Sequence, residues 1–315
     1  MAFLGVEHGT RAVRFALLLG ERGDWRFWEV SRERAARLRT RELLRRIEAG
    51  LGHPLGGVRF AAIAYGMGDG FSEVRPLHSL GSRGVRGPAG PRTGGGARAW
   101  DALRLSGAPS VAVPGLHRGT LPAPFRFYSH GAAADKVGTA RAVAEAAGRD
   151  FLLADVGAAA AFVAVSRGRF AGALDSTLLA PGMLLGPLDV EALRSRRRPM
   201  DSFSRGGVVP RLGLRGPEAA LAGRSARARE ARRTLALHTA LGLGALHSLF
   251  GGPLYAAGEA GELIRPGVAR LLGREVRSAG GLAPARGLAL LARDVASGRR
   301  SILGVPVHPS CRTLR

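Results

Sequence analysis

The stretch near the N-terminus that could do chemistry is Gly5–Thr10, in which Glu7 is followed by Gly9 and Thr10. Apolar runs of strand character flank it, so the pattern predicts a β-hairpin. The backbone amide of Gly9 can approach a ligand that a side chain would exclude. The Thr10 hydroxyl and the turn amides could donate to a phosphate, while Glu7 could hold a metal ion directly or through water.

A similar pattern returns halfway along the chain. Phe151–Val156 is an apolar run that contains Asp155 near its end, and Gly157 follows it. A second apolar run, Ala159–Val165, predicts the return strand of another hairpin. Two acid–glycine hairpins, one opening each half of the chain, predict two related lobes that face each other across a ligand site.

Three further stretches carry polar side chains after expected strands, where the active-site loops of α/β sheets lie. Asp69 follows a strand expected over 59–65, although Asp-Gly pairs are also plain turn formers. His117 and Arg118 follow a strand expected over 110–113. Arginine offers fixed bidentate charge to an acyl or phosphoryl oxygen, and histidine can titrate near neutrality. The stretch 128–130, Tyr-Ser-His, has the same two interpretations, as a ligand site or as an ordinary loop.

Acid-x-Gly-Thr hairpins in both halves resemble the superfamily of acetate and sugar kinases, Hsp70 and actin. More closely, the sequence resembles the archaeal family called methanogenesis marker protein 12. The stretches that carry this resemblance are 5–10, 66–70, 114–118, 128–130, 135–137, 180–182 and 186–189. Because they span most of the chain, the resemblance implies a fold and a cellular setting, and it leaves the reaction open.

The superfamily resemblance implies an α/β, two-lobed actin-like ATPase (ribonuclease H-like) fold with an interlobe cleft. The N-terminal lobe is then expected over residues 1–148 and the C-terminal lobe over 149–300, followed by a tail at 301–315. A helix rich in small residues is expected from 133 to 148, where it would cross between the lobes and permit close helix contact. A C-terminal helix opening near Ala283 would make the second connection.

The same resemblance implies ATP and Mg²⁺ as ligands. Glu7 and Asp155 would be the catalytic acids and the metal ligands, and Arg118 is a further catalytic candidate. The other residues expected to bind the nucleotide lie in the hairpin turns and in a strand-to-helix turn that would hold the adenosine: Gly9, Thr10, Gly157, Ala257, Gly258 and Glu259.

Local patterns predict the elements that would position these residues. Ser31 is a good N-cap for a helix through Ile47 that closes at Gly50. A long helix is expected over 225–250, and a strand over 254–257.

Composition narrows the class of protein. At 315 residues, with 46% hydrophobic residues, the chain can build a sizeable core in two domains. Cys311 is the only cysteine, which excludes an intramolecular disulfide and favours a reducing cytoplasm. Residues 234–258 lack acidic and basic side chains apart from two histidines, but glycines and Pro253 interrupt them. We therefore expect a buried helix and strand there, with no membrane span, and we expect no signal peptide at the N-terminus.

The formal net charge is +23, and Lys136 is the only lysine among the 47 basic residues. Such a protein attracts polyanions non-specifically, with a steep salt dependence. Aromatic residues make up only 6%, and no nucleic-acid-binding motif is legible. The arginine excess is therefore interpreted as a bias over the whole chain that gives a solvated basic surface, with polyanion binding at low salt.

Two departures weaken the expectation of catalysis. Glu7 is one methylene longer than the aspartate usual in the superfamily, and Ala158 and Ala159 stand where a Ser or Thr often follows Gly157. Phosphoryl transfer depends almost wholly on positioning and charge. The leading hypothesis is an ATP-binding kinase-like or ATPase protein of methanogen metabolism. The alternatives are a non-catalytic nucleotide-sensing or assembly protein, which would have a protein partner, and a basic nucleic-acid-binding protein.

Overall fold

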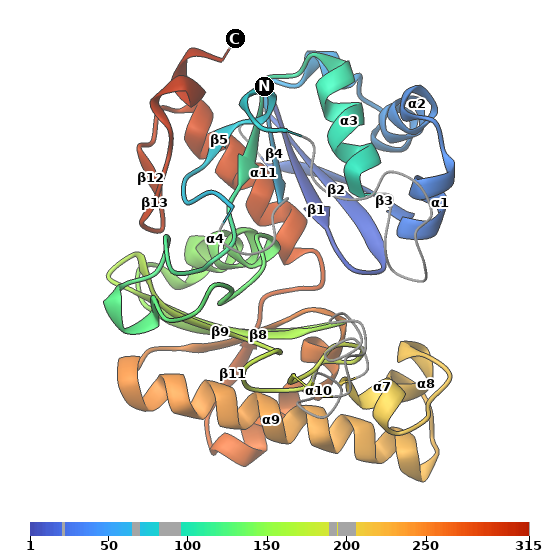
Figure 1. Cartoon of the computed structure of the whole chain (residues 1–315), viewed down its shortest axis with the longest axis vertical. Helices are drawn as coiled ribbons and strands as arrows, with labels where there is room; N and C mark the ends of the chain where they lie inside the picture. The colour runs from blue at the N-terminus through green and yellow to red at the C-terminus, as the bar shows by residue number, and fades with distance from the viewer. Residues whose placement is uncertain (21–22, 65–69, 82–95, 189–193, 195–205, 315) are drawn as a thin grey trace. The chain divides into compact units, whose positions relative to one another are not determined.

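The computed structural model describes residues 1–20, 23–64, 70–81, 96–188, 194 and 206–314. These divide into two compact units (Figure 1). Unit 1 comprises 1–120, 133–142 and 282–315, and unit 2 comprises 121–132 and 143–281. The division differs from the expected 1–148, 149–300 and 301–315. The C-terminal helix and the tail belong to unit 1, whereas 121–132 and 143–148 belong to unit 2.

The sheet of unit 1 has six strands in the order β3-β2-β1-β4-β6-β5. The first three strands form an antiparallel meander, β1 and β4 pair in parallel, and so do β4 and β6. The strands are β1 (Ala2–His8), β2 (Ala12–Leu19), β3 (Asp24–Ser31), β4 (Phe60–Ala64), β5 (Arg75–Pro76) and β6 (Ser110–Val113).

Helices α1 (Arg32–Arg37), α2 (Thr40–Leu51) and α3 (Gly96–Ser106) pack in unit 1, and α4 (Asp135–Ala147) begins there. Helix α11 (Ala283–Ala296) packs on β1, β2 and β4. This packing places the C-terminal helix in unit 1. The short strands β12 (Ser301–Ile302) and β13 (Val305–Pro306) and the 3-10 helices η1 (Leu55–Gly57), η2 (Leu77–Ser79) and η4 (Pro309–Thr313) complete the unit.

The single helix expected from Ser31 through Ile47, closing at Gly50, is wrong in two respects. Ser31 does cap α1, accepting a hydrogen bond from the Arg34 amide at 3.2 Å. Leu38, however, is extended and ends α1, and α2 begins at Thr40. Gly50 remains helical against the Trp28 ring, and Gly52, with a left-handed φ of 60°, ends α2 instead.

The sheet of unit 2 has five strands in the order β11-β10-β7-β8-β9. The strands are β7 (Phe151–Val156), β8 (Ala160–Ser166), β9 (Arg169–Asp175), β10 (Leu254–Ala257) and β11 (Val276–Ser278). Helices α9 (Ala226–Phe250) and α10 (Glu259–Leu272) pack on this sheet around a buried apolar core. The smaller elements are η3 (Ala123–Phe125), α7 (Val208–Arg211) and α8 (Pro217–Leu221). The expected helix over 225–250 and strand over 254–257 are confirmed.

The two sheets repeat one plan. In unit 1 an antiparallel meander, β1-β2-β3, is extended from β1 by the parallel strands β4 and β6. In unit 2 the meander β7-β8-β9 is extended from β7 by the parallel strands β10 and β11. Each acid–glycine hairpin therefore opens an equivalent sheet. Among the described residues, no helix is both long and apolar enough to cross a bilayer.

Two glycines let the elements of unit 1 approach closely. The backbone of Gly5 on β1 lies directly against the carbonyl of Ala285 on α11. A Cβ at Gly138 on α4 would lie 2.6 Å from the carbonyl oxygen of Pro284, the preceding residue of α11. Neither position has room for a side chain, so β1 and α4 converge on the first turn of α11.

Candidate functional site

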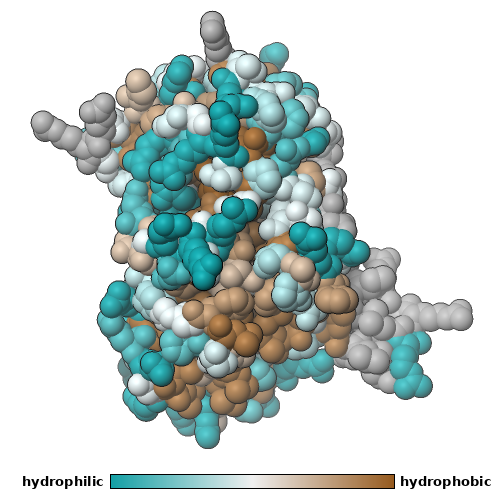
Figure 2. Space-filling view, turned by 90° about the vertical axis from the view of Figure 1, so that its left-hand side faces the viewer, coloured by the Kyte–Doolittle hydropathy of each residue, from teal (hydrophilic) through white to brown (hydrophobic). Residues whose placement is uncertain are grey.

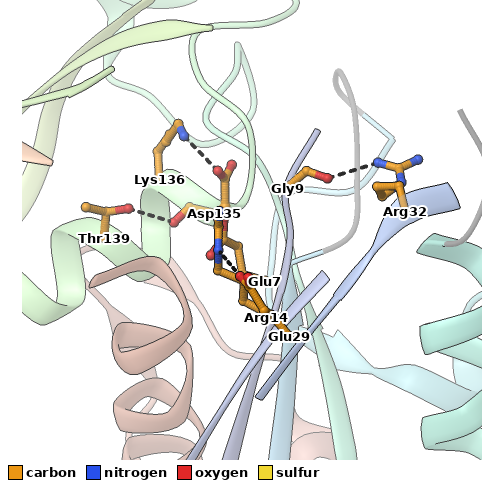
Figure 3. Close-up of polar contacts among 8 residues, drawn as sticks. All are labelled: Glu7, Gly9, Arg14, Glu29, Arg32, Asp135, Lys136 and Thr139. Carbon is orange, nitrogen blue, oxygen red and sulfur yellow. Dashed lines mark hydrogen bonds and ion pairs between the residues drawn. The ribbon is translucent and has the colours of Figure 1, made fainter. Parts of the chain in front are cut away.

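Glu7 is the second-last residue of β1 and is only 3% exposed. The β1–β2 register places Arg14 directly opposite it, on the same face of the sheet. Arg14 Nη1 donates to Glu7 Oε1 at 3.0 Å (Figure 3). The expected metal-binding acid of the first hairpin is therefore held in an ion pair with a cation of the neighbouring strand.

Arg14 also contacts an acid on its other side. The β2–β3 register pairs it with Glu29, and its Nε donates to Glu29 Oε2 at 3.2 Å. Burial disfavours the charge on Arg14, but the two carboxylates outweigh it and raise the pKa of Arg14. The result is a row of acid, arginine and acid across three strands. Arg14 was not among the predicted site residues, although the predicted hairpin would have placed it opposite Glu7.

The turn between β1 and β2 is held by the start of α1. Arg32 Nη1 donates to the carbonyl of Gly9 at 3.1 Å (Figure 3). The Arg32 amide donates to the carbonyl of Arg11 at 2.9 Å. A Cβ at Gly9 would lie 3.0 Å from Glu7 Oε1, so this position accommodates a side chain poorly. Thr10 is half-buried in the same turn. The turn thus brings together Glu7, Gly9 and Thr10, the three residues predicted there.

His8, at the end of β1, is a half-buried base that was not among the predicted site residues. Burial, and then the charge of Arg32, lower the pKa of His8 from 6.5 to about 3. The backbone of Gly96, the first residue of α3, lies against its ring and leaves no space for a Cβ. His8 is therefore neutral in the folded protein.

The lowered pKa of His8 predicts that the folded protein becomes less stable as the pH falls. Between pH 6.5 and about 3, the unfolded state binds a proton at His8 that the folded state does not. The free energy of unfolding should therefore fall as the pH drops through this window, by up to about 1.4 kcal/mol per pH unit. Urea denaturation at several pH values measures this slope. His8→Gln should flatten it, whereas His78→Gln, at an exposed position, should leave it unchanged. Equal slopes for both variants would contradict this role.

The first turn of α4 adds an ion pair to which the sequence pattern assigned no role. Lys136 Nζ lies 2.7 Å from Asp135 Oδ2, and both side chains are largely buried. Thr139 donates to the Asp135 carbonyl at 3.1 Å. Because Gly5 and Gly138 meet adjacent residues of α11, this turn lies in the same part of unit 1 as the end of β1 (Figure 3).

Asp155 holds the equivalent place in unit 2, as the second-last residue of β7, and is 3% exposed. Here the residue directly opposite is Ala161 on β8, which in turn lies opposite Asp175 on β9. Both carboxylates thus project from one face of the sheet, with an alanine between them. His130 Nε2 lies 3.6 Å from Asp175 Oδ2. The second row therefore lacks the central arginine of the first.

The turn after β7 is tied to the loop that follows β9. The Gly157 amide donates to the Ala159 carbonyl at 2.8 Å. The carbonyl of Ala158 accepts hydrogen bonds from Leu184 at 2.9 Å and from Leu185 at 2.8 Å. A Cβ at Gly157 would meet nothing within 4 Å, so the approach to this glycine within unit 2 is open. Hydrogen bonds thus hold the hairpin turn to this loop, and Gly157 leaves space beside it for a ligand.

Gly258 connects β10 to α10 beside this acid. It is the N-cap of α10, with a φ of 80°, and a Cβ there would lie 2.9 Å from Asp155 Oδ1. The Asp155 carboxylate therefore lies beside the N-terminus of α10. Ala257 is fully buried, whereas Glu259 is exposed. The structure thus brings Asp155 and Gly258 together, although about 100 residues separate them along the chain.

Of the two residues His117 and Arg118, which were predicted to contact a ligand, only Arg118 remains a candidate. His117 is completely buried; its Nδ1 accepts from the Gly119 amide at 3.0 Å, and its Nε2 lies 2.9 Å from the Phe71 carbonyl. Both ring nitrogens are thus engaged, and His117 is a structural residue that cannot contact a ligand. Arg118 is exposed on the adjacent position. Asp69 lies outside the described residues.

Within the described part of the chain, no three His, Cys, Asp or Glu side chains are grouped closely enough to hold a metal ion by themselves. Mg²⁺ is commonly bound by one or two carboxylates together with substrate phosphates. The donor chemistry of Asp155 fits that mode, in which the nucleotide supplies the remaining oxygens, whereas Glu7 is already held by Arg14.

Comparisons with known proteins define the relationship of the chain. No family model matches it. It is 35% identical to a UPF0285 protein of Methanosarcina acetivorans, over 98% of this chain and 99% of that one. It is 32% identical to UPF0285 protein MK0078 of Methanopyrus kandleri, over 97% and 98% of the two chains.

Solved structures show the fold. A ROK family glucokinase from Streptomyces griseus, in complex with glucose and AMPPNP, matches with a TM-score of 0.54 at 17% identity, over 93% of this chain and all of that one. Porphyromonas gingivalis acetate kinase matches with a TM-score of 0.56 at 13% identity, over 93% and 98% of the two chains. The chain therefore has the α/β actin-like ATPase fold, as expected.

Proposed function

Because the chain belongs to the UPF0285 family of methanogens and has the actin-like ATPase fold, we propose that it binds Mg-ATP. The observation that supports this most directly is the three-stranded meander repeated in the two units. In each unit, a buried acid lies near the end of the first strand of the meander. A kinase-like or ATPase reaction is the leading form of the proposal. Its setting in methanogen metabolism follows the resemblance to methanogenesis marker protein 12, which stays a prediction.

We assign the two acids different roles. Asp155 would hold Mg²⁺, because it lies at the end of β7, next to the open turn at Gly157 and beside Gly258 at the N-terminus of α10. Glu7 is already paired with Arg14, and a metal ion would have to compete with that guanidinium. In this proposal Glu7 orients Arg14, whose fixed charge suits a phosphate oxygen.

The remaining predicted residues would contact the nucleotide through backbone and small groups. Gly9, Thr10 and Gly157 lie in the two hairpin turns and would approach phosphates. Gly258 and the exposed Glu259 would lie along the adenosine, and the buried Ala257 would only shape that turn. The exposed Arg118 stays a catalytic candidate whose guanidinium would contact an acyl or phosphoryl oxygen.

A non-catalytic nucleotide sensor is the second candidate, and the Glu7–Arg14 pair favours it. An acid neutralised by an arginine is less able to bind a metal or to accept a proton than a solvated carboxylate. The methyl groups of Ala158 and Ala159 also supply no hydroxyl at the second hairpin. Slow or absent hydrolysis beside firm Mg-ATP binding would select this candidate, and sustained turnover would select the enzyme.

The first prediction is that Mg-ATP stabilises the protein against heat. At a hundredfold excess over Kd, a ligand bound only by the folded state adds about 2.7 kcal/mol of stability. We expect a clear rise in the thermal midpoint with Mg-ATP, measured by differential scanning calorimetry. The rise should shrink when EDTA removes the metal.

The control addresses the net charge of +23, which attracts any polyanion. Magnesium tripolyphosphate carries the phosphate charge without the nucleoside. A specific site predicts a larger shift with Mg-ATP that persists in about 0.5 M salt. Equal shifts for the two ligands, both lost in salt, would replace the nucleotide site with non-specific polyanion binding.

A further inference from the structure

Helix α9 exposes leucines at its centre. Leu237 is 46% exposed and Leu241 is 57% exposed, and they straddle the midpoint of this 25-residue helix. From Thr234 to Phe250 the helix has no acidic or basic residue apart from two histidines. Exposed leucines at the centre of a long helix, on a side without formal charge, are typical of an interface. A second apolar surface then covers them.

Helix α10 extends this apolar surface. It packs beside α9, where Gly267 lies against Ala236 and Leu272 lies against Gly244. The next residues on its solvent side include Leu263, 47% exposed, and Leu271, 55% exposed. We call these four leucines of α9 and α10 the leucine face. Hydrophobic residues also gather on the surface of unit 2 at the end of α9, where Leu249 is 71% exposed (Figure 2).

The charges on α9 are confined to its first turns, which carry four arginines and one acid: Arg227, Arg229, Glu230, Arg232 and Arg233. Arg232 donates to backbone carbonyls of the preceding segment, and the arginines outnumber the single acid at this end. The opposite end of α9 stops at Gly251, where the last carbonyl groups form the negative end of the helix dipole. The helix is thus basic at one end, apolar in the middle and partly negative at the other end.

We propose that a second copy of this chain covers the leucine face, with the two α9 helices antiparallel about a twofold axis near residue 239. Such an interface is self-complementary: Leu237 meets Leu241 of the partner subunit, and the reverse contact follows by symmetry. The basic end of each α9 then lies beside the negative end of the other. Ala245 and Ser248 are small and exposed, so they permit close approach where the partner's Arg233 crosses.

Electrostatics select this arrangement over the alternatives. With 1.5 Å per residue, the two copies of Arg233 lie about 18 Å apart and those of Arg229 about 30 Å apart. Both separations exceed the Debye length of about 8 Å at physiological salt. Parallel helices would instead place arginine beside arginine. Because the whole chain carries +23, long-range repulsion opposes the dimer at low salt, and added salt should strengthen it.

The experiment is sedimentation velocity on the full chain at micromolar concentration, from about 0.05 to 0.5 M NaCl. We expect twice the chain mass of 32.9 kDa, with a dimer fraction that rises with salt. Leu237→Glu with Leu241→Glu should weaken dimerisation at least tenfold, whereas Leu105→Glu, at a 47% exposed position of α3, should not. A monomer at every salt concentration, or a dimer unaffected by the double substitution, would overturn the proposal. Binding of an added acidic helix or anionic vesicle that is stronger at low salt than dimerisation would also overturn the proposal. The leucine face would then be covered by that helix or by a membrane.

Crosslinking tests the direction of the helices. Cys311 is buried, and burial raises the pKa of its thiol to about 12, so it should not react. With a short bis-maleimide, Leu241→Cys should crosslink the two copies near the axis, and Arg229→Cys should not. Efficient crosslinking through position 229 would overturn the antiparallel arrangement. Circular dichroism and the thermal midpoint of each variant show whether it has folded.

Discussion

Asp155→Asn should remove the magnesium dependence of ATP binding and leave the fold intact. The amide keeps the shape of the side chain at the end of β7 but loses the charge that would hold the metal. Contacts to a charged group contribute about 1.5–3 kcal/mol, so we expect a loss of about 10- to 100-fold in affinity for Mg-ATP. Isothermal titration with and without EDTA measures both quantities: the metal should strengthen binding in the wild type and have no effect in the variant.

The matched control is Asp175→Asn, which makes the same change in the same row of the sheet. Asp175 is 6% exposed and lies two strands from Asp155, roughly 10 Å away. This variant should retain magnesium-dependent binding. If Asp155 serves only to stabilise the N-terminus of α10, Asp155→Asn will lower the thermal midpoint and bind Mg-ATP as the wild type does, and the metal assignment would then be wrong.

Arg141→Met should be the most destabilising of the charge-removing substitutions in unit 1. Arg141 on α4 forms a bidentate pair with Asp294 on α11, with Nε–Oδ2 at 2.6 Å and Nη2–Oδ1 at 3.2 Å. The two residues are 8% and 4% exposed. Methionine leaves a buried carboxylate whose only described basic neighbour is the more exposed Arg299 at 3.5 Å. Breaking a buried pair from one side costs about 3–5 kcal/mol, which urea denaturation would show as a lower midpoint.

Two controls separate burial from charge. Arg141→Met combined with Asp294→Leu removes both charges and should recover most of the lost stability, because an apolar pair can replace a buried ion pair. Arg46→Met breaks the Arg46–Glu42 pair on α2, whose side chains are 41% and 38% exposed, and should cost about 0.5 kcal/mol or less. Equal losses for Arg141→Met and Arg46→Met would contradict the importance of burial at the α4–α11 contact.

The sequence correctly predicted features that depend on neighbouring residues. Alternating apolar runs and turn glycines determine a hairpin locally, so the acids at the ends of β1 and β7 could be identified from the sequence pattern alone. The N-cap Ser31 and the long helix α9 are local in the same sense. The break after Leu38 was missed, because residues 32–47 contain no proline or glycine to mark it.

By itself, then, the sequence determined that two acid–glycine hairpins open two similar sheets, since period and turn chemistry are properties of short segments. Only the tertiary structure decided what surrounds them. The ion pair of Glu7 with Arg14, the approach of Gly258 to Asp155, and the burial of His117 all depend on which segments pack together. Packing also assigned α11 to unit 1, because Gly5 admits the Ala285 backbone. Contacts between distant segments are set by shape and burial, which leave no periodic signal along the chain.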